Sequence, residues 1–268
     1  MSLRNDPSLW KIPTLDIDAN KYTRGHVVVY GGYPMTGAAR LAARSAARSG
    51  AGMVTIGTRS SALDSYLASV ESILVKPADN SQQWGELLVK ANAAVVGPGA
   101  GVGELTKDIV LESLRRGVPT VLDADALTSF VGAVGELAKV ARDRTVMTPH
   151  EGEFSRLFDI EGDRETRACA AAKLIDGVIV LKGSQTVIAS PDDRLVINDN
   201  APPTLATAGS GDVLAGLIAS LLARGMTTFD AACAGVWVHG EAAKQAAPGL
   251  IADDLPGLIA LVLADIAD

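Results

Sequence analysis

A glycine-rich turn with one carboxylate, Ala-Gly-Ser-Gly-Asp-Val-Leu at residues 208–214, opens onto apolar residues at helical spacing. The start of a helix exposes unpaired N–H groups that attract anions, and glycine lets a phosphate approach them closely. A carboxylate is unfavourable there unless it has a chemical task. We therefore interpret Asp212 as the base for a hydroxyl that attacks a phosphoryl group, while the turn stabilises the developing charge. The alternative is a helix-start acid that complements the dipole.

Two further candidate segments each follow an apolar run. Asp123 and Asp125 come after residues 120–122 and could hold Mg²⁺ through water or orient a ligand hydroxyl. Asp125 is equally placed to cap a helix that starts near Ala126. The Gly-Pro-Gly-Ala-Gly run at 97–101 could bring backbone amides against a polar ligand, or make a tight strand-to-helix turn.

His150 and Lys182 also follow predicted strands. Pro149 keeps the backbone extended before His150, which favours a ligand contact at the rim of a sheet over a structural role. We interpret the remaining histidines, His26 and His239, as structural. A lysine at the end of a buried strand can meet a phosphate as a point charge, and the alternative is a side chain that reaches solvent.

The candidate residues need a framework, and short apolar runs alternating with helix-like segments provide it. The predicted strands are residues 27–30, 53–57, 93–96, 120–122, 145–147 and 178–181. This order predicts a mainly parallel sheet with helices on both faces, and such sheets place ligands beyond the carboxyl ends of their strands. Residues 186–189 and 195–197 predict an antiparallel hairpin near the C-terminal edge. We expect two closing helices, 212–223 and about 229–245, and an irregular segment 1–24.

Composition narrows the classes of protein. The 268 residues, with 48% hydrophobic side chains and without an evident linker or repeat, predict a single α/β domain over 1–268. The net charge of −7 argues against nucleic-acid binding. Interrupted apolar stretches argue against a membrane span, and the N-terminus lacks an apolar signal core. Cys169 and Cys233 are far apart without metal spacing, which fits small buried side chains in a reducing cytoplasm.

Seven segments together form a specific series. They are Lys-Tyr-Thr-Arg-Gly-His-Val-Val-Val at 21–29, the segment 37–52 that begins Gly-Ala-Ala-Arg, Val-Gly-Pro-Gly-Ala-Gly at 96–101, Leu-Asp-Ala-Asp-Ala-Leu at 122–127, Thr-Pro-His-Glu-Gly-Glu-Phe at 148–154, Val-Leu-Lys-Gly-Ser-Gln-Thr at 180–186 and the turn at 208–216. The series resembles the ribokinase-like superfamily and, within it, the ADP- or ATP-dependent NAD(P)H-hydrate dehydratases with a carbohydrate-kinase-like domain. The resemblance implies a three-layer α/β/α sandwich.

The resemblance also implies a reaction and a site. ADP or ATP would drive dehydration of (6S)-NAD(P)H hydrate to NAD(P)H, because phosphorylation turns the C6 hydroxyl into a good leaving group, and Asp212 would be the catalytic base. The nucleotide would contact Lys182, Gly183, Ser184, Gln185, Thr186, Gly209, Ser210 and Gly211. The hydrated dinucleotide would contact Ala38, Gly99, Gly101, Asp123, His150 and Asp212.

Further expectations follow from the family. Mg²⁺ would bridge phosphates with few direct protein ligands, and the assembly would be a homotetramer. Many relatives carry an epimerase domain before this one, whereas only the irregular segment of about 24 residues stands in that place here, so we expect a separate epimerase as functional partner. Gly-Ser-Gly-Asp stands where Gly-Thr-Gly-Asp is common and keeps the hydroxyl. The rival functions are a small-molecule kinase of the same fold and a nonenzymatic nucleotide sensor.

Overall fold

The strands form one mixed sheet in the computed structural model, which describes residues 3–14, 17–246 and 248–266. Within these residues the order across the sheet is β1-β10-β9-β8-β7-β6-β5-β2-β3-β4. Neighbouring strands are parallel except at β9, which runs antiparallel to β8 and to β10. The strands are β1 (Leu3–Arg4), β2 (His26–Gly31), β3 (Met53–Thr58), β4 (Leu74–Pro77), β5 (Ala93–Val96), β6 (Thr120–Leu122), β7 (Thr145–Met147), β8 (Val178–Leu181), β9 (Thr186–Ala189) and β10 (Leu195–Asn198).

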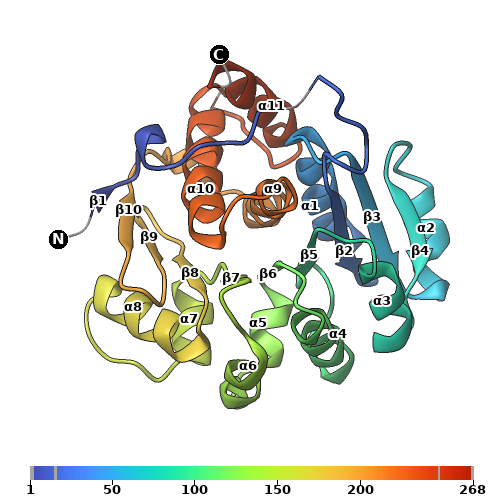
Figure 1. The fold of residues 1–268 in the computed structure, drawn as a ribbon, viewed down its shortest axis with the longest axis horizontal. Helices are drawn as coiled ribbons and strands as arrows, with labels where there is room; N and C mark the ends of the chain where they lie inside the picture. Colours follow the sequence, from blue (N-terminus) through green and yellow to red (C-terminus); the bar gives the residue numbers. More distant parts are fainter. Residues whose placement is uncertain (1–2, 15–16, 247, 267–268) are drawn as a thin grey trace.

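Helices cover both faces of the sheet, which gives three layers (Figure 1). One face carries α1 (Thr36–Arg48), α2 (Leu63–Leu67), α9 (Ser210–Ala223), α10 (Thr228–Lys244) and α11 (Leu255–Asp265). The other carries α3 (Ser81–Leu88), α4 (Glu104–Arg115), α5 (Asp125–Ser129), α6 (Val134–Val140), α7 (Glu151–Leu157) and α8 (Arg164–Ile175). Short 3-10 helices lie at Pro7–Leu9, Ser60–Ala62 and Pro203–Leu205. The expected three-layer α/β/α sandwich, with a mainly parallel sheet and an antiparallel hairpin, is confirmed.

The central strands β2, β5 and β8 are buried at every position, as continuous apolar runs between two helical layers require. Small residues bring together α9 and α1, which cover the same face of the sheet. A Cβ on Gly216 of α9 would lie 2.0 Å from the carbonyl oxygen of Ala42 on α1, so only glycine allows this approach. The Ser45 hydroxyl on α1 donates to the carbonyl oxygen of Val213, 2.6 Å away. These contacts fix the first half of α9 against the middle and second half of α1.

Several sequence predictions were wrong at the periphery. Residues 1–24, predicted irregular, include β1, which pairs parallel with β10, and the 3-10 helix at Pro7–Leu9. Residues 1, 2, 15 and 16 of that segment lie outside the described residues. The prediction that two helices close the chain is also wrong, because α11 follows them. Two-residue and four-residue strands such as β1 and β4 are too short to show an alternation of apolar and polar residues.

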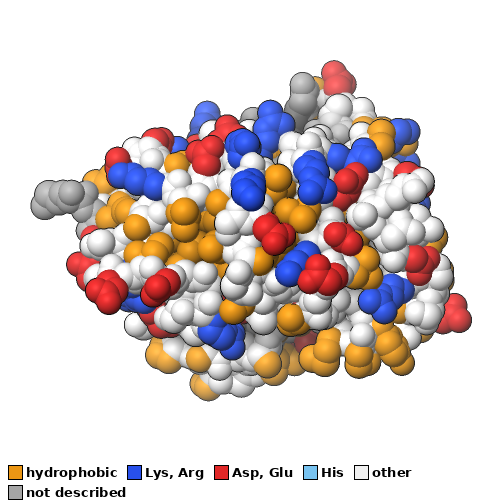
Figure 2. Space-filling view, turned by 90° about the horizontal axis from the view of Figure 1, so that it is seen from below, with side chains coloured by type: hydrophobic (Ala, Val, Ile, Leu, Met, Phe, Trp, Pro, Cys, Tyr) orange, Lys and Arg blue, Asp and Glu red, His pale blue; other side chains and the backbone are white. Residues whose placement is uncertain are grey.

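The outer surface of the layer formed by α3 to α8 carries acidic and basic side chains intermingled with apolar ones (Figure 2). A protein that binds the nucleic-acid backbone instead gathers Lys and Arg on one face. Among the described residues, no helix is long and apolar enough to cross a membrane. Cys233 is buried and Cys169 is partly buried, and both are free thiols.

Candidate active site

The loops that follow β5, β6, β7 and β8 meet the start of α9 at the carboxyl edge of the sheet. The loops after β7 and β8 touch directly, because the Lys182 amide donates to the carbonyl oxygen of Pro149 at 2.8 Å. His150 and Lys182 form a parallel bridge at the same point. Parallel strands therefore deliver the separate sequence motifs to one place, as expected for this class of sheet.

Asp212 lies in the first turn of α9, whose N-cap Gly209 has a left-handed φ of 89°. The Ser210 hydroxyl donates to the carbonyl oxygen of Leu205 at 2.8 Å, so it fixes the turn. Burial, and then the negative charge of Asp123, raise the pKa of Asp212 to about 7, although the Lys182 charge lowers it. A carboxyl with this pKa can accept and release a proton near neutral pH, which suits a general base.

Lys182 and Asp123 form an ion pair beside this carboxyl. Lys182 Nζ lies 2.8 Å from Asp123 Oδ1, and the Asp123 side chain is only 3% exposed. Burial alone would lower the pKa of Lys182, but the adjacent Asp123 carboxylate raises it, so the lysine stays charged. A Cβ on Gly211 would lie 3.1 Å from Lys182 Nζ, which explains a glycine at this position of the turn. The lysine thus does not escape to solvent; it faces the α9 turn.

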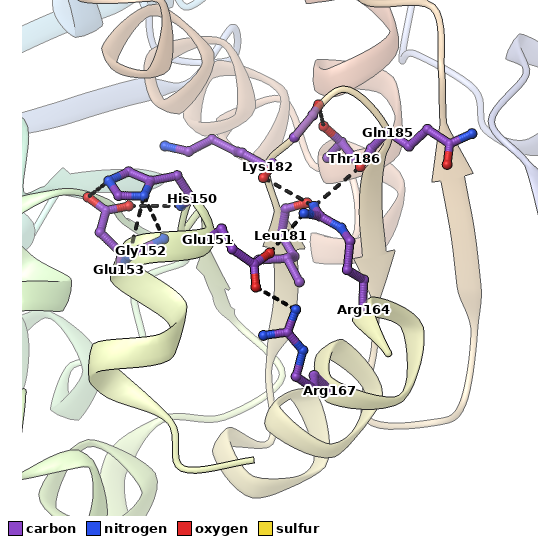
Figure 3. A network of polar contacts seen from close by, with 11 residues as sticks. His150, Glu151, Gly152, Glu153, Arg164, Arg167, Leu181, Lys182, Gln185 and Thr186 are labelled. Atoms are coloured by element: carbon purple, nitrogen blue, oxygen red, sulfur yellow. Dashed lines mark hydrogen bonds and ion pairs between the residues drawn. The ribbon is translucent and has the colours of Figure 1, made fainter. Parts of the chain in front are cut away.

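His150 has a structural role at the start of α7, and its ring remains accessible. Its Nδ1 accepts from the amides of Gly152 at 3.0 Å and Glu153 at 3.3 Å, and Glu153 accepts from the His150 amide at 2.9 Å (Figure 3). These bonds form a capping box at the start of α7. Because Nδ1 is an acceptor, the neutral ring carries its proton on Nε2. The side chain is 57% exposed and lines a cavity, so Nε2–H is available to a ligand.

A cavity of about 660 Å³ lies next to the α9 turn. Six of the eight residues predicted to bind nucleotide line it, and Gln185 and Gly209 do not. Its wall consists of His150, Lys182, Gly183, Ser184, Thr186, Ala201, Pro202, Pro203, Leu205, Ala206, Ser210, Gly211, Leu214, Val236 and His239. The volume is in the range of small-molecule sites, and the wall is apolar on the side away from Lys182.

Sequence reasoning missed the apolar wall. The loop after β10, with Pro202 and Pro203, and the α10 residue Val236 supply it. The Ala-Pro-Pro sequence at 201–203 was an available signal, since consecutive prolines make a rigid loop. His239, interpreted as structural, is buried and lines the cavity as well. Burial, and then the Lys182 charge, lower the pKa of His239 to about 4, so this ring is neutral at neutral pH.

The glycine loop after β5 lies on the other side of Asp123. Gly99 has a φ of 63°, and a Cβ there would lie 3.3 Å from the Cβ of Ala38 at the start of α1. Gly101 has a φ of 85°, faces open space, and donates its amide to Asp125 Oδ2 at 2.9 Å. Asp125 is the first residue of α5 and does not cap it, so the capping interpretation is wrong. Its carboxylate positions the Gly101 loop instead.

Comparison with known proteins identifies the family. Residues 26–261 match the family model described as NAD(P)H-hydrate dehydratase. The chain belongs to this family. The ADP-dependent (S)-NAD(P)H-hydrate dehydratase of Neisseria meningitidis is 38% identical, with 91% of this chain and 85% of that protein covered. The bifunctional NAD(P)H-hydrate repair enzyme Nnr of Salinibacter ruber is 37% identical over 94% of this chain. The chain spans about half, 51%, of that bifunctional relative.

Solved structures of the dehydratase family agree with this placement. The ADP/ATP-dependent NAD(P)H-hydrate dehydratase of Bacillus subtilis, co-crystallized with ATP/Mg²⁺, is 29% identical with a TM-score of 0.82, covering 96% of this chain and 94% of that one. A hydroxyethylthiazole kinase of Pyrococcus horikoshii has a TM-score of 0.65 at 17% identity, which shows a shared fold alone. The dehydratase resemblance that the seven sequence segments indicated is confirmed.

Proposed function

We propose that this chain dehydrates (6S)-NAD(P)H hydrate to NAD(P)H at the expense of ADP or ATP, with AMP or ADP and phosphate as the other products. The observation that carries the proposal is the Asp212 carboxyl, with a pKa of about 7, in an anion-binding turn beside the Lys182 charge. This arrangement suits proton removal from a hydroxyl that attacks a phosphoryl group. The named dehydratase relatives support the choice of substrate.

The proposed reaction has two steps, a phosphoryl transfer and an elimination. Asp212 takes the proton of the C6 hydroxyl, whose oxygen forms a bond to the terminal phosphorus of the nucleotide while the bridging P–O bond breaks. The C6–O bond of the phosphate ester then breaks and inorganic phosphate leaves, while the neighbouring ring carbon gives up a proton to water and the ring double bond returns. The amides of the α9 turn and Lys182 would stabilise the charge on the transferring group.

The nucleotide is proposed to lie in the cavity. Lys182 and the 183–186 loop would contact phosphates, and the wall formed by Pro202, Leu205 and Val236 suits the apolar faces of a base. The hydrated dinucleotide would extend from Asp212 across Asp123 to the Gly99–Ala38 contact, with Gly101 in open space beneath it. His150 lines the cavity, and its Nε2–H is proposed as a donor to the dinucleotide.

Mg²⁺ is proposed as a companion of the nucleotide. Among the described residues, no group of three His, Cys, Asp or Glu side chains is arranged to hold a metal ion. The site therefore fits Mg²⁺ as an ion held mainly by phosphate oxygens and water, with Asp212 and Asp123 as the nearby hard oxygen donors. The ion would supply positive charge to the phosphates, and the Bacillus subtilis relative was co-crystallized with ATP/Mg²⁺.

A single assay tests the reaction and its rival. The protein is incubated with hydrated NADPH, Mg²⁺ and either ADP or ATP, and the reduced-nicotinamide absorbance is followed. Return of the absorbance with stoichiometric release of inorganic phosphate is expected. A small-molecule kinase would leave the phosphate on its product, and a nucleotide sensor would show no turnover. Either result would contradict the proposal.

We also propose a homotetramer in the cytoplasm that works with an epimerase, which would convert the other hydrate epimer into the substrate. The two free thiols fit a reducing compartment, and the bifunctional names of several relatives support the link to an epimerase; the tetramer is proposed from the family resemblance alone. Light scattering after gel filtration tests the assembly. Addition of an epimerase to the assay tests the partnership, because a mixture of hydrate epimers should then be consumed completely rather than in part.

A further inference from the structure

Arg164 is the first residue of α8. It contacts the loop after β8 and the segment after β7, and it does not line the cavity. Its Nη2 lies 2.9 Å from the carbonyl oxygen of Leu181, 3.1 Å from that of Lys182 and 3.3 Å from that of Gln185. Its Nη1 donates to Glu151 Oε2 at 2.8 Å (Figure 3). One guanidinium therefore joins the loop after β8 to the residue that follows His150.

The position of this arginine is unusual for its helix. A cation in the first turn of a helix opposes the dipole and costs stability, whereas acids are favoured there. Arg164 and Arg167 both lie in the first turn of α8, and both contact Glu151. Arg167 also lies over the Phe154 ring, 5.4 Å from its centroid, which fixes the pair against α7. The free-energy cost of these cations in the first turn is offset by their bonds to groups outside α8, namely Glu151 and the carbonyls of the loop after β8.

Gly183 provides independent support. A Cβ at this position would lie 2.7 Å from Arg164 Nη2, so any other residue would displace the guanidinium. The glycine does not have a left-handed φ, so backbone strain does not explain it. The glycine in the loop and the arginine on α8 therefore fit each other.

We infer that Arg164 is a positioning residue that fixes the 182–186 loop for the nucleotide phosphates and couples that loop to the His150 segment through Glu151. The inference rests on the proposed function, since it assigns the loop to a nucleotide. A planar fork can serve several acceptors at once, which a lysine ammonium on a flexible stem does not reproduce. Arg164 acts through the loop carbonyls and does not touch the reacting atoms.

The test compares Arg164→Ala and Arg164→Lys with the control Lys173→Ala. Lys173 lies on the same helix as Arg164, and its substitution removes an exposed ion pair with Asp193. ADP and ATP binding are measured by calorimetry without the hydrate, and kcat and KM are measured with it. We expect the nucleotide Kd to rise about tenfold in both Arg164 variants, with kcat at saturation changed by less than about threefold. The control should match the wild type.

A double-mutant cycle separates positioning from general structure. Gly183→Ala should weaken ADP binding in the wild type by displacing Arg164, but much less in the Arg164→Ala background, where there is no guanidinium to displace. Fully additive losses, or an unchanged Kd in a folded Arg164→Ala protein, would overturn the inference. Rescue by Arg164→Lys would also overturn it. If Arg164→Ala does not fold, Arg164→Lys and Gly183→Ala in the wild type decide. Absence of ADP binding by the wild type would instead defeat the proposed function.

Discussion

Lys182 Nζ lies 2.8 Å from Asp123 Oδ1, and this buried pair stands directly beside the carboxyl of Asp212. Beyond its proposed contact with a phosphate, Lys182 influences the proposed base, because its charge lowers the pKa of Asp212 while Asp123 raises it. A nucleotide phosphate that draws Lys182 away from Asp123 would change both influences at once. The ion pair of Lys182 and Asp123 therefore acts on the protonation of Asp212 with two opposite charges.

Replacement of Lys182 by methionine should move the acidic limb of the pH–rate profile to higher pH. The base must be ionised, and loss of the positive charge makes ionisation of Asp212 less favourable. The measurement is kcat against pH at saturating nucleotide, with Lys182→Arg as the control that keeps the charge. An unshifted limb in Lys182→Met would show that the lysine does not influence the base.

Asp212→Asn should reduce turnover by about 10²–10⁴-fold, the usual range for a positioned proton acceptor. The substitution keeps the size of the side chain, so ADP binding should change little. Single-turnover rates and calorimetric ADP affinities measure the two quantities separately. Near-normal turnover in the variant would exclude Asp212 as the base.

Asp212 should also make stability depend on pH. Its folded pKa of about 7 lies above the ordinary value of 3.8, so the folded protein binds this proton more tightly than the unfolded chain does. The carboxyl therefore destabilises the fold progressively as pH rises from about 4 to about 7. Asp212→Asn removes this cost, and its Tm should exceed that of the wild type by more at about pH 8 than at about pH 5. The same Tm difference at both pH values would contradict the assignment.

The two roles of His150 can be separated by two substitutions. His150→Ala loses the cap of α7 and the Nε2–H donor, so it should cost about 1 kcal/mol of stability and raise the KM for the hydrate. His150→Asn restores a good cap, but its shorter side chain does not carry an N–H group to the position of Nε2–H. We expect the Asn variant to recover the Tm of the wild type and to keep the raised KM. Recovery of both would show that His150 serves only the helix.

The parallel part of the fold could be predicted because buried strands appear as unbroken apolar runs. The segments 93–96, 120–122, 145–147 and 178–181 coincide with β5, β6, β7 and β8. Motif residues that follow these strands were predicted to meet, since parallel strands share one carboxyl edge. The family assignment followed from the order of seven segments rather than from any one of them.

Other features depend on tertiary contacts that no local pattern reveals. β1 exists because β10 offers it an edge, and the two residues carry no periodic signal of their own. The partner of Lys182 could not be predicted, because Asp123 lies 59 positions away. His239 appeared structural because an apolar helix surrounds it, and only the fold shows that this part of α10 lines the cavity.

The contact between Gly216 and Ala42 brings the backbones of α9 and α1 together without an intervening side chain. At this point of contact no side chain can change rotamer to accommodate a shift of one helix past the other. Asp212 and Ala38 lie in the first turns of these two helices. Because Arg164 holds the loop after β8, we expect any adjustment around a ligand to fall to the loop after β10, which carries Pro202 and Leu205.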